Sequence, residues 1–194
     1  MNKPLIEMKY LKEYNQGEIC FIFGSGESLL KSLPTIFKYD FDKIKDSFRI
    51  SINRRPLQLI PCDMIVSIDF TQAEFNWNHI KHDTIKISPF DKYSDYKLDI
   101  LVPIDGRYSS LLATWLACYM EFKEIVLVGM DCYQGKKRYF DSDENIPYEC
   151  NHGNNDLESH FATWRRVAEK CSNPERIKAL NNPLEKVFGR WEGK

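Results

Sequence analysis

Short apolar runs alternate with stretches of helical periodicity along the chain. Four of the runs are predominantly apolar: residues 19–23 (ICFIF), 48–52 (FRISI), 63–68 (DMIVSI) and 124–130 (EIVLVGM). Weaker runs lie at 84–88 and 99–103. Continuous hydrophobicity over so few residues is typical of strands in a parallel sheet that is covered on both faces. The pattern therefore predicts buried parallel strands.

The intervening stretches repeat their apolar residues with helical spacing at 27–37, 109–122 and 156–171. Ser28, and Ser109 or Ser110, stand where helix N-caps are expected. Strands that alternate with helices form an open α/β sheet. We therefore expect a single Rossmann-like domain over residues 1–194, with a mostly parallel sheet and helices on both faces.

Charge and cysteine content narrow the functional classes. The chain has 194 residues and carries 27 Lys and Arg against 28 Asp and Glu, so it gives no strong nucleic-acid signal. Its N-terminal stretch lacks an apolar signal core, and no apolar run approaches the roughly 20 residues that span a membrane. The six cysteines are scattered without a CxxC pair, which favours free thiols. We expect a cytoplasmic protein and leave formation of a homo-oligomer open.

A glycine turn follows the first apolar run. Gly24, Ser25 and Gly26 separate the run from a helix that begins near Ser28, and such a junction presents backbone N–H groups and a positive helix end to an anion. The third glycine of a dinucleotide fingerprint and the lysine of a P-loop are both missing. The turn is thus either a phosphate site or a tight turn required by the backbone.

A second polar region follows the run at 124–130. Gly129, Asp131, Tyr133 and Tyr139 come directly after this run, and ligands of open α/β sheets lie beyond the carboxyl ends of the strands. We therefore expect the glycine turn and this region to face one ligand. Residues 133–156 are long, polar and poor in periodicity, which predicts a lid.

The order of these motifs resembles the bacterial α-2,3/2,8-sialyltransferase family over roughly residues 19 to 188. The resemblance is carried by FGSGESL, FRISIN, SSLLATWLA, KEIVLVGMDCYQGKKRYF and NHGNND. The 6-hydroxymethylpterin diphosphokinase-like family is similar in the glycine turn and in the helix that leads to the GMD strand end.

The sialyltransferase resemblance implies a metal-independent glycosyltransferase. It would move a sugar from a nucleotide donor, with CMP as the expected nucleotide, to an acceptor hydroxyl. His152 would be the general base, and Tyr133 and Tyr139 would contact the departing phosphate. The implied nucleotide-binding residues are Gly24, Ser25, Gly26, Ser28, Asn53, Asp69, Ser109, Ser110 and Asp131.

Two acidic residues depart from the sialyltransferase pattern and keep other functions open. Glu27 replaces a proline of the glycine turn, and Asp69 stands where an uncharged donor-binding residue is expected. Together with Asp131 they could hold Mg²⁺ in a diphosphokinase-like enzyme that transfers pyrophosphate from ATP. The segment between Tyr133 and His152 is also shorter than the family's lid, which leaves a non-catalytic nucleotide-binding module as a third reading.

Overall fold

A computed structural model describes most of the chain. The residues that it describes are 6–14, 18–39, 46–68, 83–89, 94, 96–97, 108–132, 134, 139–141 and 157–193. Of the predicted lid at 133–156, only residues 134 and 139–141 fall within them, and the predicted strand at 99–103 lies outside. No helix among the described residues is long and apolar enough to cross a membrane.

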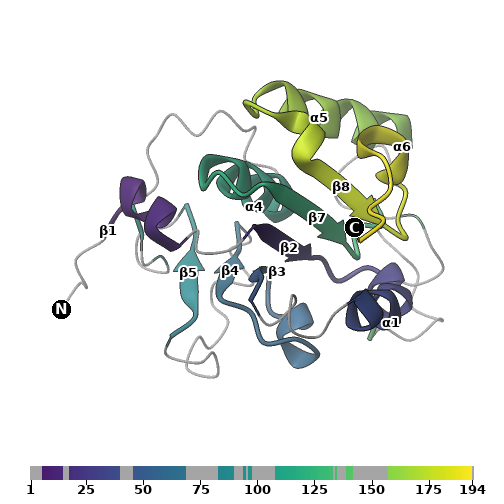
Figure 1. Cartoon of the computed structure of the whole chain (residues 1–194), viewed down its shortest axis with the longest axis horizontal. Helices are drawn as coiled ribbons and strands as arrows, with labels where there is room; N and C mark the ends of the chain where they lie inside the picture. Colours follow the sequence, from purple (N-terminus) through teal and green to yellow (C-terminus); the bar gives the residue numbers. More distant parts are fainter. Residues whose placement is uncertain are drawn as a thin grey trace.

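Six parallel strands form the central sheet, in the order β5-β4-β3-β2-β7-β8 (Figure 1). Their bounds are β2 Ile19–Phe23, β3 Phe48–Ile52, β4 Met64–Val66, β5 Ile85–Ile87, β7 Glu124–Val128 and β8 Ile177–Leu180. A separate parallel pair joins β1 (Ile6–Glu7) to β6 (Tyr96–Lys97). The predicted α/β class with a parallel, Rossmann-like sheet is confirmed.

Helices connect the strands and cover both faces of the sheet. The α-helices are α1 (Ser28–Tyr39), α4 (Ser109–Tyr119), α5 (Leu157–Glu169) and α6 (Glu185–Phe188), and the 3-10 helices are η1 (Met8–Tyr14), η2 (Arg55–Gln58) and η5 (Pro174–Arg176). Figure 1 shows α1 and α5 on opposite sides of the sheet. All three predicted helices are present, although each is trimmed or shifted at its ends.

The continuous apolar strands divide their side chains between two cores. Cys20 and Ile22 of β2 pack in the cluster beneath α4 and α5, whereas Phe21 and Phe23 pack in the cluster beneath α1. The same alternation runs through β7, whose odd and even residues enter different clusters. Both faces of β2 and β7 are therefore buried, which is why the buried parts of their sequences show no polar alternation.

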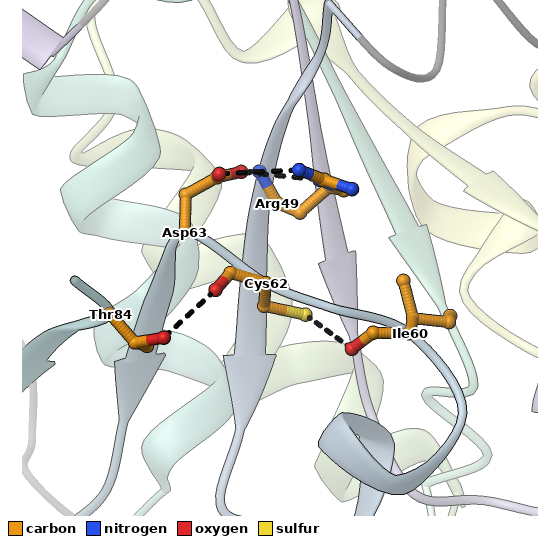
Figure 2. Close-up of polar contacts among 5 residues, drawn as sticks. All are labelled: Arg49, Ile60, Cys62, Asp63 and Thr84. Atoms are coloured by element: carbon orange, nitrogen blue, oxygen red, sulfur yellow. Dashed lines mark hydrogen bonds and ion pairs between the residues drawn. The ribbon is translucent and has the colours of Figure 1, made fainter. Parts of the chain in front are cut away.

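A polar cluster fixes the register of β3, β4 and β5 at their amino ends (Figure 2). The Asp63 carboxylate accepts the backbone N–H of Arg49 at 2.8 Å and the Arg49 side chain at 3.2 Å, while the Asp63 N–H donates to the Arg49 carbonyl at 2.9 Å. On the other side, the Thr84 hydroxyl donates to the Cys62 carbonyl at 3.3 Å. These contacts align the strands so that their carboxyl ends meet at one edge.

Candidate functional site

The connections between strands reverse direction beside β2. From β2 the chain passes through α1 to β3 on one side, whereas β7 is followed by α5 and then β8 on the other side. Ligands of open α/β sheets lie outside the carboxyl ends of the strands at such a reversal. The candidate site is therefore the carboxyl edge of the sheet, centred on the ends of β2 and β7.

The glycine turn is docked against the end of β7. The N–H groups of Gly24 and Gly26 donate to the carbonyls of Val128 at 2.7 Å and Gly129 at 3.0 Å. The Ser28 N–H donates to the Asp131 carboxylate at 2.8 Å. The sequence predicts that these three N–H groups bind a phosphate, but each already donates to an acceptor within the chain. A phosphate bound there would have to displace those acceptors.

Close approach of two backbones explains why glycine occupies these positions. A Cβ built on Gly24 would lie 2.5 Å from the Gly129 carbonyl oxygen, and one built on Gly26 would lie 2.6 Å from the Asp131 Cγ. Gly129 itself has a φ of +68°, a conformation that favours glycine. The turn therefore serves the junction between β2 and β7, whatever else it binds.

Asp131 caps α1 from a different element. Its carboxylate accepts hydrogen bonds from both the backbone N–H and the hydroxyl of Ser28, where α1 begins. Burial raises the pKa of Asp131 above its ordinary value and the Glu27 carboxylate adds to the rise, whereas the Ser28 hydrogen bonds and Lys31 oppose it. Glu27 also pairs with Lys31 at 3.2 Å. The amino end of α1 was expected to bind an anionic ligand, but it already binds the carboxylate of Asp131.

Two buried polar atoms without partners among the described residues lie at the carboxyl ends of β3 and β4. Within the described part of the chain, the Asn53 Oδ1 and the Ser67 Oγ make no hydrogen bond, and Ser67 is only 2% exposed. The two residues are neighbours, because the Asn53 N–H donates to the carbonyl of Val66 at 3.0 Å. Asn53 has a φ of 56°, and the Ser51 hydroxyl donates to its carbonyl at 2.7 Å. The strand ends hold both residues in place, while the two oxygens have no hydrogen-bond partner among the described residues.

The first turn of α4 adjoins these strand ends. Ser109 is not the N-cap that the sequence suggests, because the N-cap position is held by Tyr108 in extended conformation, and no side chain among the described residues caps the helix. Instead, the Ser109 hydroxyl accepts the N–H of Ile68 at 3.0 Å, which ties the helix to the end of β4. Ser110 follows in the same turn and is half-buried. The Ser109 hydroxyl, which was expected to cap α4, instead makes a tertiary hydrogen bond beyond the end of β4.

Tyr139 and its neighbour Phe140 contact both the segment after β3 and the glycine turn after β2. The guanidinium of Arg55, in η2 after β3, stacks on the Tyr139 ring at 4.0 Å and pairs with Asp141. Next to it, the Phe140 N–H donates to the Ser25 carbonyl at 2.9 Å. Tyr139 is therefore held near both the glycine turn and the residues that follow β3, and its role in binding stays a prediction.

Sequence reasoning missed three residues of this edge. Ser67 is missed because nothing in a local pattern distinguishes an unsatisfied hydroxyl from a satisfied one. Arg55 is missed because it can be recognised only by its contacts with Tyr139 and Asp141, which lie far from it in the sequence. His160, in the first turn of α5, is interpreted from the sequence as a surface or helix residue, but it is buried, with its ring 6.0 Å from that of Tyr108. The predicted Tyr133, Asp69 and His152 lie outside the described residues.

No group of three or more metal-ligating side chains comes together in the part of the chain that the structure describes. Glu27 and Asp131 are close enough to interact, but Asp131 already accepts hydrogen bonds from Ser28, and Asp69 lies outside the described residues.

Comparisons with known protein families, curated proteins and solved structures found no match. The sialyltransferase resemblance therefore stays a prediction.

Proposed function

We propose that the protein is a nucleotide-dependent transferase of sialyltransferase-like type, which binds a nucleotide-sugar donor at the carboxyl edge of the sheet. The observation that carries the proposal is the pair of buried oxygens on Asn53 and Ser67 that have no partner among the described residues. An unsatisfied buried polar atom costs about 1–3 kcal/mol, so its retention at a ligand edge favours a binding role. A nucleotide offers both donors and acceptors to such atoms.

The surroundings of these two oxygens suit a nucleotide. The amino end of α4, with Ser109 and Ser110, adds the positive end of a helix dipole beside the strands. Tyr139 and Arg55 lie at the same edge and supply a phenol and a cation. A departing nucleotide phosphate needs hydrogen-bond donors, and the acceptor hydroxyl needs a base. In this proposal Tyr133 and Tyr139 contact the phosphate and His152 is the base.

Binding is tested first, by thermal shift with CMP, UDP, GDP and ATP, each with and without Mg²⁺. A ligand that binds the folded state raises its melting temperature by mass action, and we expect CMP to do so without metal. Ser67→Ala removes a hydroxyl that makes no hydrogen bond among the described residues, so the free variant should melt no lower than wild type. Its CMP-induced shift should nevertheless fall.

Thr84→Ala is the matched control at the opposite edge. The Thr84 hydroxyl is buried and bonded to the Cys62 carbonyl, so its loss should lower the melting temperature while the CMP-induced shift is kept. The reverse pattern, with a normal CMP shift in Ser67→Ala, removes Ser67 from the site. No response to any of the four nucleotides contradicts the proposal as a whole.

Catalysis separates the transferase from the diphosphokinase-like alternative, which the closeness of Glu27 and Asp131 favours. In a donor-hydrolysis or transfer assay, His152→Ala should lower the rate about 10²–10⁴-fold while CMP still binds, because a general base acts on the acceptor hydroxyl. EDTA should leave the wild-type rate unchanged. If instead EDTA and Asp131→Asn stop turnover of ATP and His152→Ala is mild, the enzyme is a diphosphokinase.

A further inference from the structure

Residues 139–141 are tied to the carboxyl ends of two neighbouring strands. On one side, the Phe140 N–H donates to the carbonyl of Ser25, in the glycine turn after β2, at 2.9 Å. On the other side, the guanidinium of Arg55, in η2 after β3, pairs with the Asp141 carboxylate. Because β2 and β3 are paired in the sheet, one short segment joins both strand ends.

The position of Arg55 is fixed by its backbone and by its partner. η2 begins at Arg55, its second residue is the buried Pro56, and the Leu59 N–H donates to the Pro56 carbonyl at 3.0 Å. The side chains of Arg55 and Asp141 are only 26% and 27% exposed, so solvent screens their attraction less than it screens a fully exposed pair. The guanidinium is thus held at both ends.

The same guanidinium lies over the ring of Tyr139, with its Cζ 4.0 Å from the ring centroid. The face of an aromatic ring attracts a cation, and the flat guanidinium stacks on the ring in a way that an ammonium group does not. The next residue, Phe140, is buried in the core cluster beneath α1. The ring of Tyr139 is therefore held by Arg55, and its backbone is anchored beside a core residue.

We propose that Arg55 is a positioning residue of the candidate site, which holds the Tyr139 phenol at the carboxyl edge of the sheet before a ligand binds. The inference rests on the proposed function for what the phenol does, namely contact the departing phosphate. A hydrogen-bond donor that is in place before charge develops costs no reorganisation during the reaction. A misplacement of about 1 Å costs about a hundredfold in rate. Arg55 thus acts through Tyr139.

Amide exchange on the free protein tests the positioning without any nucleotide. Arg55→Met keeps an apolar stem but removes the charge and the planar group. Exchange of the Phe140 amide, followed by NMR, should become about tenfold faster, because the ion pair and the stacked ring both oppose local opening. Unchanged exchange of this amide in Arg55→Met overturns the proposal.

Arg49→Met is the matched control. Arg49 also forms a partly buried pair with an aspartate, Asp63, but at the amino ends of the strands (Figure 2). Its substitution should leave exchange of the Phe140 amide unchanged. If this amide exchanges equally fast in Arg49→Met and Arg55→Met, the effect is a general loss of stability, and the proposal is wrong.

A double-variant cycle shows whether Arg55 acts through the phenol. Tyr139→Phe removes the hydroxyl but keeps the ring on which Arg55 stacks. In the transfer or donor-hydrolysis assay, Arg55→Met should lower kcat about ten- to a hundredfold with a smaller change in KM. Added to Tyr139→Phe, it should cost little more, because the phenol that it positions is already gone. Two losses that multiply in full overturn the proposal.

Arg55→Lys separates stacking from charge. The lysine keeps a positive charge for Asp141 but lacks the planar group, so it should restore only part of the kcat lost in Arg55→Met. A wild-type kcat in Arg55→Lys contradicts the role of the stacked ring. If the wild-type protein neither transfers nor hydrolyses any nucleotide-sugar donor, the proposed function fails, and exchange of the Phe140 amide alone decides whether Arg55 positions this segment.

Discussion

At the scale of single residues, Gly26 shows how one position can be explained by two different needs. The sequence pattern predicts that a Cβ at Gly26 hinders a phosphate more than it hinders folding. The contacts show that a Cβ there also hinders folding, because it would lie 2.6 Å from the Asp131 Cγ and 2.8 Å from the Gly129 oxygen. A glycine selected for backbone docking and one selected for phosphate approach are identical in the sequence.

We therefore expect Gly26→Ala to lower the free energy of unfolding by about 1–3 kcal/mol, since the end of β7 must shift to admit the methyl group. Urea unfolding followed by circular dichroism measures the loss. Asp131→Ala removes the carboxyl group that the methyl group meets, so the double variant should lose less than the sum of the two single losses. If the loss of unfolding free energy in the double variant equals the sum of the two single losses, the added methyl group does not clash with the Asp131 carboxyl group.

At the scale of elements, the amino ends of β3 and β4 depend on one carboxylate. Asp63→Ala leaves the Arg49 N–H without its side-chain acceptor, and hydrogen bonds to charged groups contribute about 1.5–3 kcal/mol each. We expect a loss of that size in chemical unfolding. Arg49→Met removes only the half-exposed ion pair and should cost about 0.2–1 kcal/mol. Equal losses in the two variants would mean that the ion pair, not the backbone contact, holds the register.

Element prediction succeeded where burial dictates the residue pattern. The run at 19–23 matches β2, which is apolar throughout because both of its faces are covered. The run at 48–52 matches β3, whose Phe48, Ile50 and Ile52 enter one core cluster. The strand β8 was not predicted, because it has four residues, lies at the edge of the sheet and is interrupted by the half-buried Lys178. Such a segment is too short and too mixed for a period to be read from it.

At the scale of the whole molecule, the location of the candidate site was predictable and its internal contacts were not. Topology alone places Gly24, Asn53 and Asp131 at one edge, since parallel strands end together. It does not reveal that Asp131 caps α1, or that the Ser109 hydroxyl joins the end of β4. Those contacts depend on how side chains from segments far apart in the chain are oriented. The periodicity of a short sequence window carries no information about such contacts.

The position of β2 between β3 and β7 also bears on how the chain reaches its fold. One edge of β2 pairs with β3, which is synthesised soon after it, but the other edge must wait for β7, and the Ser28–Asp131 contact that closes the junction joins residues 103 positions apart. Contacts of such sequence separation slow folding, and an unpaired apolar strand edge is prone to join another chain. During synthesis, the interval before residue 128 emerges is therefore the period in which the nascent chain is most exposed to misassembly.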